Sequence, residues 1–540
     1  MDKNISAYIQ KIFSALQGGG AVRVSSFVSD HILMKPVLHA GAKKKKPDMS
    51  AMTYSMLRLP FEILECDDIL FGQSDRVFLK QGIDVNTKEW KQTKALARER
   101  KCTVNTKKKQ LGFFITSVTD VEDIVTSMTA LHIEIMKLHA QLADGKEFAD
   151  CFEEGDYEKI EEILGNKLQS FIDICRKPRN WNIHLLASSN VDYAKAVQEW
   201  WINIASSRKK VPVNVYDQPV YFVSSNSHSL INILSGFPQS KKKLLLKENA
   251  DRVEENTEAF KAEAVHENDI LNYLSRFSEK KSAALRKEKK EYEKGLGLYR
   301  IAPYHHIEIE AQIFSIKDVI GNTHIDSRLK ISPAMKKKLL KSNALIVNIA
   351  YPLGMAAYRI LKEVSENVPE MRGIYIMGKA AALNASVGDI MIPHYVYDHH
   401  YENGIFVYND FNRDTFSKYV SKNSILDAQK AVTVRGTYLQ NNKSLHADFT
   451  AGRTIVEMEA GPYLNRVFEM IQPERHPEND TFVVNTDFRL GLAYYVSDTP
   501  YRSEVNLGAK RLTWEGLNGT YAISLGIVQD ILHTEYKRFS

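Results

Sequence analysis

Apolar residues near the start of the chain recur at steps of three and four, which places them on one face of a helix. Three glycines at 18–20 end this pattern, so the sequence predicts an amphipathic helix over about 5–17. The same periodicity returns over 117–142, where Thr119 and Glu122 fit a capping box. A second, longer helix is therefore predicted there.

Short apolar runs alternate with helical stretches through most of the remaining chain. The runs at 183–187 and 220–223 are each followed by Ser-Ser-Asn, at 188–190 and 224–226, and then by a helical stretch. This order predicts parallel α/β layers, and neighbouring strands would bring the two polar turns together. Helix starts of this kind attract anions, but capping by Ser and Asn is the favoured interpretation.

The composition changes between the two halves of the chain. Residues 241–294 are rich in Lys, Glu and Ala and contain no proline, which predicts exposed helices. From 344 onward, strands and helices alternate again. We therefore expect a helical and α/β domain at 1–240, a charged helical linker at 241–300 and a second α/β domain at 301–540.

Composition excludes several classes of protein. Of the 540 residues, 44% are apolar and 26% are charged, as in a globular protein rather than a disordered or fibrous one. No run approaches the roughly 18 apolar residues of a membrane span, and charges interrupt the first helix, so neither a membrane anchor nor a signal peptide is expected. The four cysteines have neither metal-ligand spacing nor the density of a disulfide framework. We expect a cytoplasmic protein without metal or cofactor.

The charge balance gives little information about partners. Lys and Arg number 72 against 66 Asp and Glu. The most basic stretch, 88–109, contains Trp90 as its one aromatic residue, whereas single-stranded nucleic acid needs several stacking rings. A solvated basic face is favoured over nucleic-acid binding.

Three segments of the second half carry candidate chemistry. Small residues at 377–383 follow a buried strand, where backbone amides can approach an anion or a sugar. At 456–460, Glu457 and Glu459 flank a strand end, and ionised carboxylates are acceptors for vicinal hydroxyls. At the end of a third apolar strand, Asp498 is placed to be partly desolvated and to serve as a general acid.

The order and spacing of these segments resemble the nucleoside phosphorylase/nucleosidase superfamily. The resemblance rests on a glycine turn that ends in Gly-Asp (378–389), a Glu-Met-Glu-Ala motif (457–460) and a Val-Ser-Asp motif (496–498) followed by Arg511. Together with the segment at 394–399, these motifs look most like AMP nucleosidase. The resemblance covers about 200 residues and implies a mixed sheet with flanking helices; residues 1–300 carry no family motif.

The resemblance also implies roles for individual residues. Asp498 would protonate the purine, with Arg511 as its helper and Ser497 beside it. Glu459 would hold the ribose hydroxyls above Met458, with Glu457 as a candidate to activate water. Further substrate contacts are expected from Gly378, Lys379 and Tyr438.

The nucleophile is water or phosphate. Bacterial phosphorylases of this type carry Arg after a Pro-Leu pair and again before the glycine turn; here Gly354 and Ile376 stand at those places. Phosphate needs such cations, so we expect a purine nucleosidase, which hydrolyses a purine nucleotide or nucleoside. Lys379 leaves phosphorolysis open, and a catalytically silent nucleotide-binding module is the third alternative. The resemblance implies a homo-oligomer.

Overall fold

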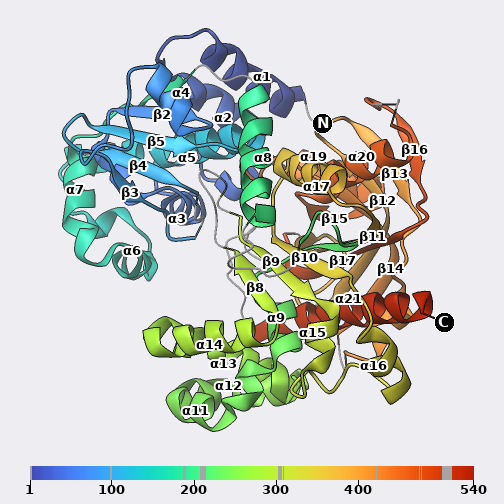
Figure 1. Ribbon diagram of the computed structural model, residues 1–540. Coiled ribbons are helices and arrows are strands. Elements are labelled where there is room, and N and C mark those ends of the chain that lie inside the picture. Colours follow the sequence, from blue (N-terminus) through green and yellow to red (C-terminus); the bar gives the residue numbers. More distant parts are fainter. Residues whose placement is uncertain are drawn as a thin grey trace.

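The computed structural model describes residues 3–97, 100–186, 190–206, 214–301, 307, 309–420, 423–473, 475, 477–500 and 514–539. Two β-sheets organise this part of the chain (Figure 1). Among the described residues, no helix is long and apolar enough to cross a membrane. The expected α/β class is confirmed.

The first sheet has six strands and belongs to the N-terminal domain. In spatial order the strands are β1 (Val22–Arg23), β6 (Asn182–Leu185), β2 (Asp68–Gly72), β5 (Gln110–Phe114), β4 (Cys102–Asn105) and β3 (Lys91–Thr93). The helices of this domain are α1 (Lys3–Gln17), α2 (Val28–Met34), α3 (Met49–Arg58), α4 (Asp75–Lys80), α5 (Val118–Ala143), α6 (Asp156–Leu164) and α7 (Leu168–Arg176). Both helices predicted from apolar periodicity are present as α1 and α5. The cap of α5 differs from the prediction, since the backbone N–H of Ser117 donates to Asp120 at 3.2 Å.

The second sheet has eleven strands and mixed strand directions. Its main path runs β16 (Thr481–Val484), β13 (Asn403–Val407), β12 (Ile390–Asp398), β14 (Ile425–Thr433), β15 (Arg453–Glu457), β11 (Met371–Ala382), β7 (Val220–Ser225), β10 (Leu345–Ala350), β9 (Ala311–Ser315) and β8 (Leu298–Ile301). The remaining strand, β17 (Arg489–Asp498), pairs with β11 and β12. The mixed sheet with flanking helices that the resemblance implied is thus observed.

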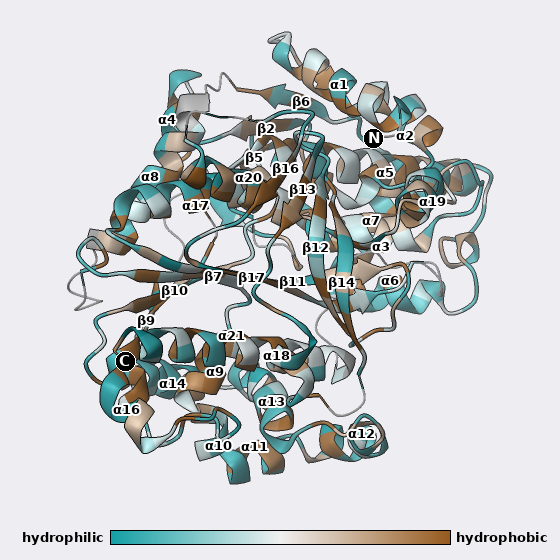
Figure 2. Ribbon diagram, turned by 90° about the vertical axis from the view of Figure 1, so that its right-hand side faces the viewer, coloured by the Kyte–Doolittle hydropathy of each residue, from teal (hydrophilic) through white to brown (hydrophobic). Residues whose placement is uncertain are grey.

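Helices cover both faces of the second sheet. One layer consists of α8 (Asn190–Ser206), α17 (Met355–Asn367) and α20 (Ala460–Ile471). The opposite layer, drawn beneath the strands in Figure 2, includes α9 (Ser229–Ser235), α13 (Glu267–Lys281), α14 (Ala283–Gly295), α15 (Ile316–Gly321), α16 (Pro333–Leu339), α18 (Arg413–Ser417) and α21 (Leu517–Arg538). The remaining α-helices of the described residues are α10 (Phe237–Ser240), α11 (Lys242–Glu248), α12 (Ala250–Ala262) and α19 (Asn442–Thr450).

Side-chain alternation along the central strands builds these two cores. On β7, Phe222 points into the core that contains Trp200 of α8 and Tyr463 of α20. Its neighbours Tyr221 and Val223 point into the core formed with α9 and α21. This two-residue period is that of a strand buried on both faces, and each buried side chain contributes about 1.5–3 kcal/mol. Continuous apolar runs are the sequence signature of such strands.

The domain boundaries differ from the expected ones. Strand β7 pairs in parallel with both β10 and β11, so residues 220–225 belong to the second sheet although the predicted N-terminal domain ends at 240. The charged stretch is helical, but Leu271, Leu274 and Leu285 are buried in the core beneath that sheet. Periodic leucines among many charges conceal this packing, so the stretch is part of the second domain rather than a linker.

The strands that precede the two Ser-Ser-Asn segments belong to different sheets. Strand β6 lies in the first sheet and β7 in the second, which makes the predicted juxtaposition wrong. Residues 187–189 lie outside the described part of the chain. In the second turn, Asn226 accepts from the backbone N–H groups of His228 and Ser229, at 2.9 and 2.6 Å. Asn226 thus binds the backbone at the start of α9, as the capping interpretation implied, although the N-cap residue itself is His228.

The segment 434–441 joins the two domains. Tyr54 of α3 donates to the hydroxyl of Thr437 at 2.8 Å. Tyr438 is fully buried, and its hydroxyl lies 2.8 Å from both the Ser55 hydroxyl and the Ala51 carbonyl oxygen. Helix α3 is therefore fixed against the second domain through directional hydrogen bonds.

An ion pair with a buried carboxylate belongs to this segment. Arg435 binds both carboxylate oxygens of Glu122 on α5, through a 3.1 Å bond from Nε and a second, short bond from Nη2. Glu122 is fully buried, and burial raises its pKa while the Arg435 charge opposes that rise. Removing one member of such a pair leaves an uncompensated charge in a poorly solvated place.

We predict that Arg435→Ala lowers the free energy of unfolding by about 3–5 kcal/mol, because Glu122 then lacks its counter-charge. Chemical denaturation followed by fluorescence measures the change. Arg176, in an exposed pair with Asp173, is the matched control, and its replacement by Ala should change stability by less than about 1 kcal/mol. Equal effects of the two substitutions would contradict a special role for the Glu122 pair.

Candidate functional site

The three candidate segments meet at one place in the second sheet. Strand β11 pairs in parallel with β17 and antiparallel with β15. As a result Ala381 is opposite both Asp498 and Val456, one residue before Glu457. A cavity of about 210 Å³ opens there, and its lining includes Lys379, Glu457, Met458, Glu459, Ser497 and Asp498. Six of the predicted site residues are thus brought together.

An irregularity in β17 orients Asp498. The pairing with β11 shifts between Ala380, opposite Val496, and Ala381, opposite Asp498, so Ser497 is the extra residue of a β-bulge. The Ser497 hydroxyl lies 2.6 Å from Oδ2 of Asp498 and 3.2 Å from the Ala380 carbonyl oxygen. Bulges commonly turn a side chain toward a site, and this one places two polar residues at the cavity.

Glu457 organises the start of α20. Its Oε2 accepts from the backbone N–H groups of Glu459 and Ala460, at 2.7 and 2.8 Å, and the Thr433 hydroxyl donates to Oε1 through a short bond. A carboxylate at a helix N-terminus is stabilised by the unsatisfied N–H groups. These bonds make Glu457 a positioning residue and weaken its candidacy for activating water.

Glu459 is the buried carboxylate of the cavity. Its side chain lies against Gly378, where an added Cβ would come within 2.7 Å of Oε1 and 2.6 Å of the Tyr494 ring. Gly378 therefore makes room for Glu459 from behind, a correction to its expected place in the cavity lining. Burial, and secondly the charge of Glu457, raise the pKa of Glu459 well above its usual range.

Lys379 is the exposed residue in the otherwise buried second half of β11. Its side chain reaches solvent, but protein atoms around the ammonium group desolvate it and lower its pKa, and the Arg58 charge adds to that effect. Asp498 and Glu459 act in the opposite direction, since their negative charges favour the ammonium form. Three charged residues of the cavity lining, Arg58, Glu459 and Asp498, thus act on the charge of Lys379.

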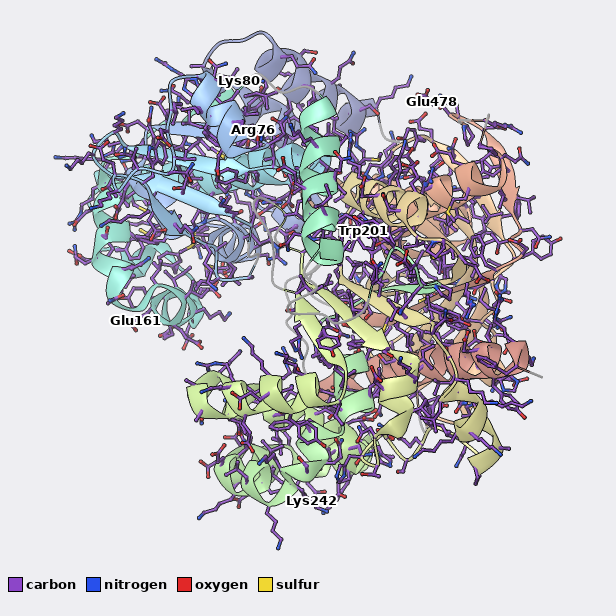
Figure 3. The ribbon with its side chains drawn as sticks, viewed as in Figure 1. Arg76, Lys80, Glu161, Trp201, Lys242 and Glu478 are labelled. Carbon is purple, nitrogen blue, oxygen red and sulfur yellow. The ribbon has the colours of Figure 1, made fainter. Side chains whose placement is uncertain are left out.

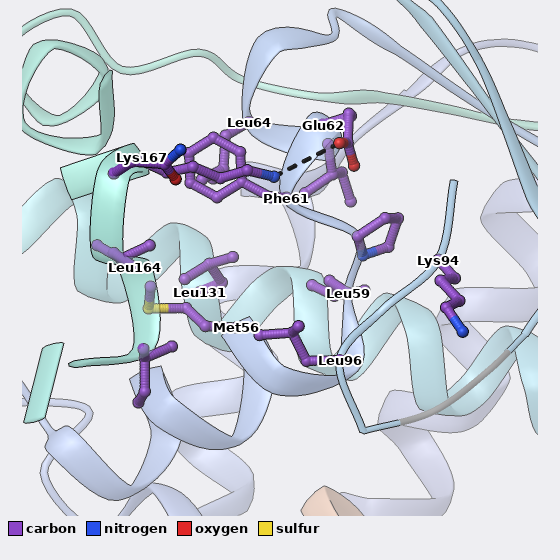
Figure 4. Close-up of a pocket in the computed structure, with 14 residues that line it drawn as sticks. Met56, Leu59, Phe61, Glu62, Leu64, Lys94, Leu96, Leu131, Leu164 and Lys167 are labelled. Carbon is purple, nitrogen blue, oxygen red and sulfur yellow. Dashed lines mark ion pairs between the residues drawn. The ribbon is translucent and has the colours of Figure 1, made fainter. Parts of the chain in front are cut away.

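Two residues of the site come from the N-terminal domain and were missed by the sequence analysis. Tyr54 and Arg58 line the cavity. They lie four residues apart on α3 and hence on the same face, with the Arg58 guanidinium carbon 3.6 Å from the Tyr54 ring centroid. Met56, on the other face, lines a separate apolar cavity of the N-terminal domain (Figure 4). No local pattern marks Arg58, because its position follows from interdomain packing.

Tyr351 also lines the cavity and has an unusual backbone conformation. Its φ is 37°, in a region that costs a non-glycine residue about 1–3 kcal/mol. The backbone N–H of Tyr351 donates to the Ser225 carbonyl oxygen at 3.1 Å, which holds this turn in place. Such strained residues are concentrated at functional sites.

The chain can be compared with known proteins on this basis. The sequence model of a family described as "Family of unknown function (DUF6909)" matches residues 24–155 and 149–533. The chain belongs to the DUF6909 family. No curated protein sequence matches it as a relative.

Several solved structures overlap with this DUF6909 protein in part. They include 5′-methylthioadenosine/S-adenosylhomocysteine nucleosidase from Campylobacter jejuni (11% identity, 45% of this chain and 92% of that one, TM-score 0.27). Purine nucleoside phosphorylase from Toxoplasma gondii is 9% identical and covers 44% of this chain and 84% of that one, with a TM-score of 0.28. The S. pneumoniae 5′-methylthioadenosine/S-adenosylhomocysteine nucleosidase is 8% identical and covers 59% of this chain and 98% of that one, with a TM-score of 0.28.

Tyr438, another expected site residue of the DUF6909 protein, does not line this cavity. Tyr438 is buried against α3, with its ring centroid 5.2 Å from that of Tyr54, so it packs the domain interface rather than stacking on a base. Arg511 lies within 501–513, outside the described residues. The sequence could not distinguish a buried interface tyrosine from one that lines a ligand cavity, because both follow an apolar strand.

We predict that Glu459→Gln stabilises the DUF6909 protein at neutral pH. The pKa of Glu459 is higher in the folded protein than in the unfolded chain, so the folded state binds the proton more tightly. The folded state therefore loses stability as the pH rises from the ordinary pKa of a glutamate toward the raised pKa. The amide removes this loss. The melting temperature of the variant should exceed that of the wild type at pH 7, and the difference should shrink toward pH 4.

Glu161→Gln is the control for this measurement. Glu161 is exposed on α6 at the periphery of the N-terminal domain (Figure 3), so its replacement should leave the melting temperature unchanged at both pH values. A Glu459→Gln variant that melts below the wild type at pH 7 would show that the carboxylate contributes to stability, contrary to this prediction.

Proposed function

We propose that this chain is a purine nucleosidase that hydrolyses the N-glycosidic bond of a purine nucleoside or nucleotide and releases the free base. The observation that carries the proposal is the presence of Glu459 and Asp498 in one cavity, at the ends of neighbouring strand pairs. The sequence resemblance gives the same two residues complementary roles. A carboxyl group for the ribose hydroxyls and an acid for the leaving group are two of the functions that ribosyl transfer uses, and the third is a nucleophile at C1′.

The arrangement suggests how the bond is broken. Glu459 accepts hydrogen bonds from the ribose hydroxyls, and Met458, which also lines the cavity, packs beneath the sugar. Asp498 donates a proton to N7 of the purine as the C1′–N9 bond breaks, and the bonding electron pair leaves with the base. Water adds to C1′, and the proton that it loses restores the acid. Positive charge on the sugar is stabilised by the nearby carboxylates in the transition state.

Phosphorolysis is the second candidate, and one observation favours it. Arg58 and Lys379 line the same cavity, which supplies the guanidinium and ammonium groups that the sequence alone did not bring together. In that reaction phosphate, rather than water, adds to C1′. Incubating the protein with adenosine, inosine, AMP and methylthioadenosine, with and without phosphate, distinguishes the candidates. Release without phosphate supports the nucleosidase, release only with phosphate supports the phosphorylase, and binding without release supports a silent module.

We predict that Asp498→Asn lowers the rate of base release by about a hundred- to ten-thousand-fold while ligand affinity changes little. The amide can still hydrogen-bond the base, but it cannot deliver a proton. Single-turnover kinetics and calorimetry measure the two quantities.

Asp487→Asn is the matched control. Asp487 is exposed just before β17, in the same domain, and its replacement should leave base release unchanged. Near-normal turnover in Asp498→Asn would remove Asp498 from the mechanism.

A further inference from the structure

A second cavity adjoins the candidate site and extends between the two domains. Its volume is about 420 Å³. Arg58, Tyr351, Leu353 and Lys379 line both cavities and form the junction between them. A ligand in the smaller cavity can therefore project a group past Arg58 and Lys379 into the larger one, or meet a separate ligand there.

Two of the four charged residues that line the larger cavity form an ion pair with each other. Arg100 binds Asp120 at 2.7 Å, and Asp120 also accepts from the backbone N–H and the hydroxyl of Thr116, at 2.6 and 2.7 Å. These two lining residues thus neutralise each other. Among the described residues that line this cavity, Arg58 and Lys379 are the other charged groups.

The junction holds two cations close enough to influence each other. The Arg58 charge is one cause of the lowered pKa of Lys379. Like charges in a partly desolvated place repel, so an anion between them would be bound favourably. The acidic residues Asp498 and Glu459, which favour the ammonium form of Lys379, line the smaller cavity and not the larger one. The larger cavity is therefore the side on which an anion meets the cations with the least opposition.

The N-terminal domain also determines which residue can supply the guanidinium. At Gly354, which has a φ of 57°, an added Cβ would collide with the side chain of Thr119 on α5. The turn after β10 therefore has no room for a cationic side chain at this position. Arg58 approaches from α3 instead, with one face of its guanidinium group covered by Tyr54, and the N–H donors of such a group lie in its plane.

We propose that Arg58 and Lys379 form a binding site for a phosphate-class anion at the junction of the two cavities, completed by the N-terminal domain. Arginine matches phosphate oxygens with paired, charge-assisted hydrogen bonds, and lysine adds a point charge. The anion is either free inorganic phosphate or the phosphate group of a nucleotide. This inference rests on the proposed function for its position next to the sugar, but anion binding can be measured without catalysis.

The test compares wild type, Arg58→Gln, Lys379→Gln and the control Arg76→Gln. Arg76 is exposed on α4, at the outer surface of the N-terminal domain (Figure 3). Calorimetry with inorganic phosphate, and with AMP against adenosine, measures binding; the base-release assay uses the same ligands. The melting temperature of each variant shows that it is folded, and Lys379→Gln keeps the test decisive if Arg58→Gln does not fold.

For wild type and Arg76→Gln we expect either phosphate binding or tighter binding of AMP than of adenosine. Phosphate-dependent base release identifies free phosphate as the source; a preference for AMP identifies the substrate. Both cation variants should lose about 10- to 100-fold of this advantage, measured against adenosine binding by the same variant, since a charged hydrogen bond contributes that much. If adenosine binds, but inorganic phosphate does not bind and AMP binds no more tightly than adenosine, the anion site is overturned and the nucleosidase proposal stands. Phosphate binding that depends on Arg58, with no base released from any ligand, would support the anion site and contradict the proposed function.

Discussion

The docking of helix α3 onto segment 434–441 determines what the candidate site contains. Tyr54, Ser55 and the backbone of Ala51 are hydrogen-bonded to Thr437 and Tyr438 across the interface. The same helix carries Arg58 into the cavity of the second domain. A cavity in the second sheet alone would present carboxylates and one lysine; the docked helix adds a guanidinium and an aromatic ring. The interface is thus part of the chemistry as well as of the fold.

Within the second domain, the position of Glu459 depends on groups that do not themselves face a ligand. Glu457 accepts hydrogen bonds from the first N–H groups of α20, and Gly378 leaves the space in which the Glu459 side chain lies. As a result, the Glu459 carboxyl group is buried and its pKa is raised. Holding such a group costs stability at neutral pH, and a functional role explains why a chain would retain it.

Much of this arrangement could be predicted from the sequence, and its gaps have physical causes. The spacing of apolar residues correctly predicted helices α1 and α5 and the alternation of strands and helices in the second domain. The motifs around Lys379, Glu459 and Asp498 meet in one cavity. The domain boundary predicted at residue 240 is too late in the chain, because an isolated apolar run such as β7 does not indicate which sheet the strand will join. The predicted linker at 241–300 is part of the second domain, because its widely spaced leucines pack into the core beneath the second sheet. Arg58 and the interface role of Tyr438 depend on contacts between residues more than 300 positions apart, which no local pattern encodes.

The most direct test is a structure of the full-length Asp498→Asn variant crystallised with adenosine and phosphate. Our account predicts the ribose hydroxyls within hydrogen-bond distance of the Glu459 carboxylate, the purine N7 beside residue 498, and phosphate in contact with Arg58 and Lys379. Adenosine bound with its ribose away from Glu459, or bound outside this cavity, would contradict the account.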